Sequence, residues 1–285
     1  MNGNGYMKSI SYLIIFLLSV LNVSPAYTEM TTSIPVLVYH EIVTTDDREP
    51  NEVVIKLDKF KEQMDFLAEQ GYSTLSMDEL VEFMKGKKSV PEKSIVLTFD
   101  DGWKNVLNAV PVLEQYNFKA SFWIIAGDWF GPDYMDWAQV KELDRHPNFE
   151  VESHTVTHPW NKDSNLLTWL DGKPLGKGIK DVKYEIYESK KILEGQLNRP
   201  VKYLAWPCGW YNERLIKIAK KAGYQALLTT WQEPSRRGDD IYQVKRLYVD
   251  GSCSMEIFKR ILAEGKPYNC NEKNISITAP VFKEK

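Results

Sequence analysis

Two carboxylates and two imidazoles follow predicted strands and could together bind a metal. A run of β-branched and apolar residues, 94–99, stops at Asp100 and Asp101, and an alternating strand pattern further on leads to His154 and His158. Two adjacent carboxylates repel, so their burial requires a cation or hydrogen-bond donors. One carboxylate and two histidines form a three-ligand set for a divalent metal with positions left for water or substrate. The second carboxylate could then act as a base.

Each half of this pattern also has an ordinary structural interpretation. The two aspartates could cap a helix, and the histidines could lie in a solvated turn. A spacing of four would also place the imidazoles on one face of a helical turn. Both halves end predicted strands in a chain with only four histidines, and this coincidence favours a metal site.

Strand and helix patterns alternate along the chain with short turns between them. Strands are expected at 34–40, 72–75, 94–99, 119–126, 149–153, 201–206, 225–230 and within 240–249, and helices at 57–70, 76–85, 103–116, 136–144, 179–197, 255–264 and before Gly223. Six or seven such βα units predict an α/β fold with one closed or distorted barrel. Reactive groups of such barrels lie at the carboxyl ends of the strands, where every candidate residue here is found. The segment 159–178 is expected to form an elaborated loop at the rim of the site.

Composition excludes some functions and leaves others open. The 285 residues are 43% hydrophobic and 26% charged, and the net charge of −3 argues against a nucleic-acid partner, which would need a basic face. A metallohydrolase acting on polynucleotides is disfavoured for the same reason. Nine tryptophans and fifteen tyrosines would suit stacking on sugar rings, although most should be core. The chain has three cysteines; Cys253 and Cys270 are one possible pair, and the sequence leaves the pairing open.

The first 26 residues have the features of a signal peptide. Lys8 precedes an apolar run over residues 10–21, and Ser24-Pro25-Ala26 provides small residues at the spacing of a cleavage site. The run is short for a bilayer span, so an uncleaved membrane anchor is the less favoured alternative. The mature chain is therefore expected to be secreted or associated with the cell envelope.

Three segments resemble, in order, signature motifs of the polysaccharide deacetylases, carbohydrate esterase family 4, also called the NodB-homology family. They are the residues 98–102 (TFDDG), 153–158 (SHTVTH) and 206–212 (WPCGWYN). The similarity covers about residues 34–265 and leaves 266–285 as a C-terminal tail. It implies a distorted (β/α)7 barrel, in a single domain, that removes acetyl groups from polysaccharides with a divalent metal, often zinc, with cobalt or nickel as other choices.

The resemblance also implies roles for individual residues. Asp101, His154 and His158 would be the metal ligands, and Asp100 would be the base that activates the attacking water. The backbone N–H of Cys208 would stabilise the tetrahedral oxyanion.

Two departures from the family pattern affect the catalytic groups. Ala205 stands where an arginine usually orients the base, and no histidine follows His158 to protonate the leaving amine. The segment around His40 resembles the N-terminal motif of the branch that deacetylates poly-β-1,6-N-acetylglucosamine, so His40 is expected to be the general acid, with a purely structural role as the alternative. Arg246, on the last strand, is a candidate for the missing arginine, unless it is a surface residue.

Other residues are candidates for substrate contact. The segment before the histidine pair also resembles that branch, and there Asp136 could orient an imidazole and Trp137 could line a groove. A helix start and a core anchor are the alternatives for these two residues. Trp206, Trp210 and Tyr211 are further expected groove residues.

The leading hypothesis is a secreted, metal-dependent deacetylase of an N-acetylglucosamine polymer, with poly-β-1,6-N-acetylglucosamine as the best candidate. Chitin oligomers, peptidoglycan and acetylated xylan are alternatives within the class, because the residues that handle the acetyl group are shared. The alternative from another class is a non-catalytic carbohydrate-binding protein on the same barrel. The oligomeric state is left open.

Overall fold

A parallel sheet that curls into a barrel forms the centre of the molecule. The computed structural model describes residues 1, 32–44, 48–127, 131–268 and 270, so the expected signal peptide and nearly all of the expected C-terminal tail lie outside the described residues. The barrel strands are β2 (Val36–Tyr39), β6 (Ser94–Phe99), β7 (Ala120–Ile124), β8 (Phe149–Ser153), β11 (Tyr203–Ala205), β12 (Ala226–Leu228) and β14 (Leu247–Tyr248). They lie in the order β12-β11-β8-β7-β6-β2-β14, and β5 (Ser73–Thr74) pairs with the beginning of β6.

The two edges of this sheet meet just before β14. Val244 forms a parallel bridge with Leu228 of β12. Its N–H donates to Leu227 O at 2.9 Å, and its carbonyl accepts the N–H of Thr229 at 2.9 Å. The chain that enters β14 therefore also pairs with β12, which closes the seven-stranded path. This is the distorted barrel that the sequence predicts.

Side chains alternate between the inside and the outside of the barrel, as the pleat requires. Those that point inward form one buried cluster with the helix α2 (Met77–Met84), which packs against the amino-terminal end of the barrel. The cluster includes Val36, Val96, Trp123, Tyr203, Ala205, Ala226 and Leu228 of the barrel strands, and Val244 just before β14. The helix begins with the expected capping box, in which Ser76 Oγ accepts the N–H of Glu79 at 3.2 Å. The carboxyl ends of the strands are thus left at the opposite end, which holds the candidate site.

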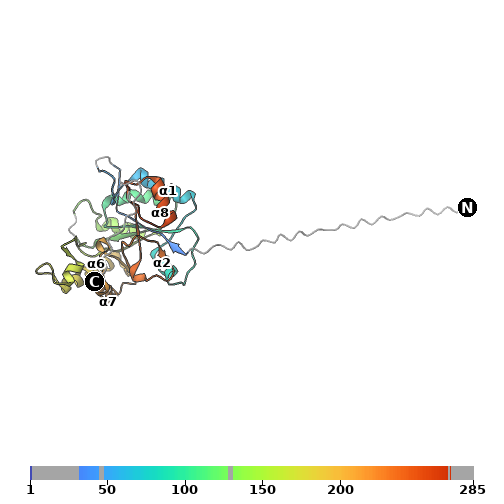
Figure 1. The fold of residues 1–285 in the computed structure, drawn as a ribbon. Helices are drawn as coiled ribbons and strands as arrows, with labels where there is room; N and C mark the ends of the chain where they lie inside the picture. Colours follow the sequence, from blue (N-terminus) through green and yellow to red (C-terminus); the bar gives the residue numbers. More distant parts are fainter. Residues whose placement is uncertain (2–31, 45–47, 128–130, 269, 271–285) are drawn as a thin grey trace.

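An outer layer of helices covers the barrel. It consists of α1 (Leu57–Glu69), α3 (Val110–Gln115), α4 (Trp137–Arg145), α6 (Ile179–Leu197), α7 (Glu213–Ala222) and α8 (Met255–Glu264). Helices α1 and α8 are neighbours, as are α6 and α7 (Figure 1). The apolar faces of these helices pack on the outward side chains of the strands in a second, larger core cluster.

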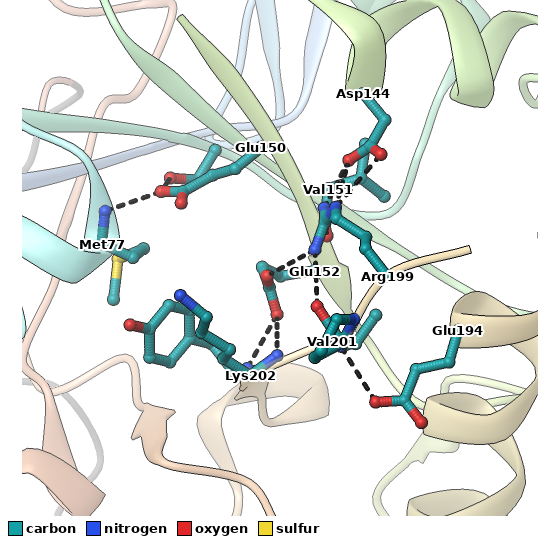
Figure 2. Close-up of polar contacts among 12 residues, drawn as sticks. Met77, Asp144, Glu150, Val151, Glu152, Glu194, Arg199, Val201 and Lys202 are labelled. Atoms are coloured by element: carbon teal, nitrogen blue, oxygen red, sulfur yellow. Dashed lines mark hydrogen bonds and ion pairs between the residues drawn. The ribbon is translucent and has the colours of Figure 1, made fainter. Parts of the chain in front are cut away.

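Polar side chains fix β8 in its place between β7 and β11 (Figure 2). Glu152 Oε2 accepts the N–H of Lys202 at 2.8 Å, and Glu150 Oε1 accepts the N–H of Met77 at 2.6 Å. Arg199 donates to the Val151 carbonyl at 2.6 Å. Burial raises the pKa of Glu152 to about 8, with the charge of Glu150 adding to the effect. These contacts hold the strand whose end carries the two candidate histidine ligands.

Several short elements differ from the sequence expectation. The helix expected at 103–116 is a 3-10 helix, η1 (Lys104–Ala109), followed by α3, and Pro111 in the first turn of α3 has no N–H to continue one regular helix. The expected loop 159–178 contains a hairpin of β9 (Trp160–Asn161) and β10 (Ser164–Asn165) and the helix α5 (Leu166–Leu170). The remaining elements are β1 (Ser33–Ile34) paired with β13 (Ser235–Arg236), β3 (Glu41–Val43) paired with β4 (Val54–Lys56), and the 3-10 helices η2 (Pro207–Gly209) and η3 (Ile241–Gln243).

The cysteines and the helix lengths complete the description. Cys253 and Cys270 form a disulfide, and Cys208 is a free thiol. Within the described part of the chain, every helix is too short or too polar to span a bilayer.

Candidate active site

The three expected metal ligands, Asp101, His154 and His158, converge at the carboxyl ends of β6 and β8. Asp101 Oδ1 lies 3.4 Å from His154 Nε2 and 3.5 Å from His158 Nε2. The ligand atoms of the three residues lie within 4.8 Å of one another. Asp101 Oδ1 is buried and has no hydrogen-bond partner among the described residues. A buried, unpartnered carboxylate oxygen that faces two imidazole nitrogens is what a bound divalent cation would require, so these residues fit such an ion.

Neighbouring groups fix the orientation of two of these side chains. His154 Nδ1 lies 2.9 Å from the carbonyl oxygen of Ala205, which leaves Nε2 as the free ring nitrogen facing Asp101. On Asp101, the Oδ2 oxygen accepts the indole N–H of Trp103 at 3.0 Å, so only Oδ1 is free to face a cation. Sequence reasoning missed Trp103, although it directly follows the Asp-Asp-Gly segment.

The pKa values in this group follow from burial and from the neighbouring charges. Burial alone would raise the pKa of Asp101, but the adjacent His154 ring and the charges of His158 and His40 lower it well below its ordinary range. Burial, with the charge of His154, lowers the pKa of His158 to about 4. His158 is therefore neutral near pH 7, as a metal-ligating imidazole must be.

The histidines approach each other through a loop and not through a helical turn. Residues 154–158 contain no helix, and Thr155 (φ 68°) and His158 (φ 46°) both have left-handed backbone conformations. The helical interpretation of the four-residue spacing was therefore wrong. The two rings nevertheless lie 4.6 Å apart, centroid to centroid, because the loop reverses direction between them.

The second carboxylate, Asp100, is paired with a buried arginine. Arg246 Nη1 donates to Asp100 Oδ1 at 2.8 Å and Nη2 donates to Oδ2 at 2.9 Å, and neither residue is more than 3% exposed. Burial would raise the pKa of Asp100, but the charges of Arg246 and His154 outweigh it and lower the pKa. The structure thus places Arg246 in the barrel, against the alternative of a surface residue, with its guanidinium on the carboxylate expected to be the base.

Comparison with known proteins agrees with this arrangement. The family model described as polysaccharide deacetylase matches residues 87–227, which include both aspartates and both histidines. The chain belongs to the polysaccharide deacetylase family. A protein of Bacillus subtilis (strain 168) that carries the name "Putative polysaccharide deacetylase YxkH" is 29% identical over 232 residues. The match covers 81% of this chain and 76% of that protein.

A further relative and a solved structure differ in how much of their length they share with this chain. The poly-beta-1,6-N-acetyl-D-glucosamine N-deacetylase of Escherichia coli (strain K12) is 28% identical over 210 residues, but the match spans only 30% of its length and 61% of this chain. The structure of the Streptococcus pyogenes deacetylase PplD, in complex with acetate, superposes with a TM-score of 0.70 at 24% identity, covering 81% of this chain and 99% of PplD. That superposition supports the barrel fold.

His40 directly follows β2, beside the two adjacent aspartates, because the N–H of Asp100 donates to the carbonyl of Tyr39 at 2.9 Å. A positive charge on His40 lowers the pKa of both Asp100 and Asp101, which reflects this proximity. The imidazole is 8% exposed and stacks on Tyr248, with centroids 5.8 Å apart and planes inclined by 11°. Its Nδ1 has no hydrogen-bond partner among the described residues. The geometry brings His40 to the site, and its role as general acid stays a prediction.

Cys208 lies next to the same carboxylates. Its backbone is left-handed, with φ of 52°. Burial and then the charges of Asp101 and Asp100 raise the pKa of its thiol to about 11. The following Gly209 has no space for a side chain, because a Cβ there would lie 2.0 Å from Thr230 Oγ1. The turn that presents Cys208 therefore requires glycine at 209, and the oxyanion role of the Cys208 N–H stays a prediction.

A cavity of about 450 Å³ opens beside the metal-site residues. Asp101, Tyr134, Met135 and Trp137 are among the residues that line it. Tyr134 stacks on Trp103, with centroids 4.3 Å apart, so one wall of the cavity contacts the residue that holds Asp101. Trp137 thus lines a cavity as expected for a groove residue, and it also packs against the core.

The other expected substrate residues have different surroundings. Trp206 is fully buried in the outer core cluster, so the prediction that it lines a groove was wrong. Its side chain lies on the outward face of the chain after β11, under the helices. Trp210 and Tyr211 are half-buried, and the Tyr211 hydroxyl donates to Gln243 at 2.9 Å. Asp136 is the N-cap of α4, and its side chain accepts the backbone N–H of Gln139 at 2.9 Å. This contact matches the alternative in which Asp136 begins a helix.

Tryptophans follow successive strands around the rim of the barrel. Those after β6, β7, β8, β11 and β12 are Trp103, Trp137, Trp160, Trp210 and Trp231. Trp160 is 67% exposed and Trp231 is 45% exposed. The carbonyl of Trp231 accepts the backbone N–H of Arg246 at 3.1 Å, so the main chain at Trp231 is held against the residue that binds Asp100. Sequence analysis did not single out Trp231, whose backbone pairs with that of Arg246 just before the closing strand.

Proposed function

We propose that this chain is an exported, metal-dependent enzyme that hydrolyses the N-acetyl groups of an N-acetylglucosamine polymer, with poly-β-1,6-N-acetylglucosamine as the best candidate. The observation that carries the proposal is the position of three groups at one end of the barrel: the Asp101–His154–His158 cluster, the Asp100–Arg246 pair, and His40 beside both. The name of the E. coli relative supports the choice of polymer.

The proposed chemistry divides the steps among these residues. A divalent cation held by Asp101, His154 and His158 would act as a Lewis acid, making water more acidic and polarising the acetyl carbonyl. Asp100, kept ionised by Arg246, would accept the proton of the attacking water. The N–H of Cys208 would donate to the oxyanion, and His40 would give a proton to the departing amine.

The position of His40 also bears on the choice within the class. No histidine follows His158 in the sequence, so the proton for the amine must come from another element, and β2 presents an imidazole beside the carboxylates. Chitin oligomers, peptidoglycan and acetylated xylan remain the alternative substrates, because the acetyl-handling groups would be the same. Export by the N-terminal segment would bring the enzyme to a polymer of the cell surface or its surroundings.

The test is release of acetate by the mature chain beginning after residue 26. The protein is stripped with a chelator, reloaded with zinc, cobalt or nickel, and incubated with β-1,6- and β-1,4-linked N-acetylglucosamine oligomers. We expect metal-dependent acetate from the β-1,6 series, abolished by Asp100→Asn without loss of bound metal. Acetate from the β-1,4 series alone would contradict the proposed linkage. Glycan retention without any acetate, unchanged by Asp100→Asn, would identify a carbohydrate-binding protein instead.

A further inference from the structure

A buried carboxylate on α6 binds the loop that joins the two candidate histidine ligands. Glu185 is 2% exposed. Its Oε2 accepts the N–H of Val156 at 2.9 Å and the N–H of Thr157 at 2.8 Å, and its Oε1 accepts the Thr157 hydroxyl at 2.5 Å. All three donors belong to the segment between His154 and His158, so one side chain accepts three hydrogen bonds from this turn.

The turn requires such support because its backbone is strained. Thr155 is β-branched and has φ of 68°, and His158 has φ of 46°. Left-handed conformations cost non-glycine residues roughly 1–2 kcal/mol each, so they persist only where surrounding contacts select them. Without those contacts, the loop would relax to other conformations, and the two Nε2 atoms would no longer face Asp101 together.

Contacts from two sides hold the turn in place. On one side, the chain after β7 donates to it, from Ala126 N–H to Thr155 O at 2.9 Å and from Gly127 N–H to Val156 O at 3.0 Å. On the other side is α6, whose Ser189, one turn after Glu185, hydrogen bonds to Ser153 at 3.0 Å between the hydroxyl oxygens. One face of α6 therefore contacts the chain just before His154 and again between the two histidines.

We propose that Glu185 is a positioning residue for the metal site, which sets the relative placement of His154 and His158 without itself contacting the ion. Groups that orient metal ligands typically change metal affinity by about 10- to 100-fold when they are removed. The proposal rests on the ligand set of the proposed function and not on its substrate, since metal binding can be measured without any glycan.

The experiment compares Glu185→Ala with Glu188→Ala in the mature chain. Glu188 lies on the same helix, is 36% exposed and pairs only with Lys191 among the contacts described here, so it is a matched control. Zinc affinity is measured by competition with a chelating dye, the visible absorption of the cobalt form reports the ligand geometry, and the melting temperature of the metal-free protein reports stability. We expect Glu185→Ala to weaken zinc binding about 10- to 100-fold and to alter the cobalt spectrum, with Glu188→Ala unchanged.

Two further variants separate positioning from general stability. Glu185→Gln keeps an oxygen that can accept both backbone N–H groups, so it should restore zinc affinity to within about threefold of wild type. Glu185→Asp, which is one methylene shorter, should bind zinc with intermediate affinity, and it decides the matter if Glu185→Ala does not fold. A melting temperature that falls while zinc affinity and the cobalt spectrum stay at wild-type values in Glu185→Asp and Glu185→Ala would overturn the proposal.

The outcome for the wild-type chain distinguishes this inference from the proposed function. If wild type binds zinc but releases no acetate from any glycan, the proposed substrate is wrong while the positioning role is still decided by the variants. If wild type binds no divalent metal at all, the ligand set fails and this inference fails with it.

Discussion

Arg246 binds both oxygens of Asp100 from a position 146 residues further along the chain, with N–O distances of 2.8 and 2.9 Å. Its Nε donates to the Thr229 carbonyl at 2.9 Å, so the guanidinium is itself fixed by the residue that follows β12. A planar guanidinium that binds both carboxylate oxygens and is itself held in place orients the carboxylate and keeps it ionised. Ala205 stands where the resemblance led us to expect an arginine, and Arg246, directly before β14, supplies a guanidinium instead.

The first prediction concerns this pair. Arg246→Lys keeps the positive charge but loses the two-pronged contact, so Asp100 should be both less well oriented and easier to protonate. Because Arg246 lowers the pKa of Asp100, its replacement raises that pKa, and the acidic limb of the pH–rate profile should move to higher pH. We expect kcat to fall about 100-fold, measured by acetate release across pH.

The control for this variant is Arg236→Lys. Arg236 is exposed and pairs with Glu233, outside the site. It should leave the pH profile and kcat unchanged. Retention of bound metal by Arg246→Lys would show that the site is intact, and an unshifted acidic limb would count against Arg246 acting through Asp100.

The second prediction concerns His40. Its replacement by alanine should remove the proton donor for the leaving amine while leaving the three ligand residues in place, so activity on acetamido sugars should fall about 10²- to 10⁴-fold with metal affinity retained. Acetate release and zinc binding are measured on the same preparation. His146→Ala is the matched control, because His146 stacks on Phe149 and faces Glu114 instead of the site. Unchanged turnover in His40→Ala would remove it from the mechanism.

The third prediction concerns the indole that holds Asp101. Trp103→Phe can keep the stacking on Tyr134 but loses the N–H that binds Asp101 Oδ2. The freed carboxylate can then rotate, and we expect zinc affinity to fall about tenfold, measured by dye competition. Trp160→Phe, at an exposed rim position, serves as the control and should bind zinc as wild type does. Equal affinities for the two variants would mean that Trp103 has no part in orienting Asp101.

The sequence predicts those parts of the site whose residues lie close together along the chain. Asp100 and Asp101 end a strand that the apolar run 94–99 defines, and the parallel arrangement of strands then brings this end close to the end of β8. A pattern of alternating strands and helices was enough to predict the barrel, because each unit is local.

The parts that the sequence could not settle depend on distant packing. Arg246 reaches Asp100 only because the barrel closes at Val244, and Glu185 meets the histidine loop only because α6 packs beside β8. Trp206 follows a strand of three residues, too short for its alternation to reveal which face its side chain takes. The pairing of β3 with β4 was not predicted for the same reason, because a strand of three residues is too short to show an alternating pattern.

The fourth prediction concerns stability and pH. Burial would raise the pKa of Glu79, but hydrogen bonds from Lys119 and Lys88 lower it from 4.5 to about 2. A carboxyl whose pKa is lower in the folded state stabilises the fold above its unfolded pKa and loses that effect as pH falls through the folded pKa. Glu79→Gln keeps the capping box but loses both ion pairs. We expect it to lower the free energy of unfolding by about 1 kcal/mol at pH 7.

The difference between wild type and Glu79→Gln should shrink as pH falls from 4.5 towards 2. Urea unfolding followed by circular dichroism at several pH values measures it. Glu82→Gln, on the same helix and paired with Lys85, is the control and should change stability little at any pH, because Glu82 is 42% exposed. A difference that stays constant down to the lowest accessible pH would mean that the effect comes from the cap and not from the charge.

The fifth prediction concerns the exposed tryptophan whose backbone pairs with that of Arg246. The carbonyl of Trp231 binds the backbone N–H of Arg246, and 45% of the residue is exposed, so its indole is available to stack on a sugar ring of a long substrate. Trp231→Ala should therefore lower kcat/KM about three- to tenfold on long oligomers, and less on the shortest substrate. The measurement is acetate release from oligomers of increasing length. Tyr184→Ala, at a 54% exposed position on α6, is the control. The same loss at every length would argue for a change at the reacting centre instead of a separate sugar site.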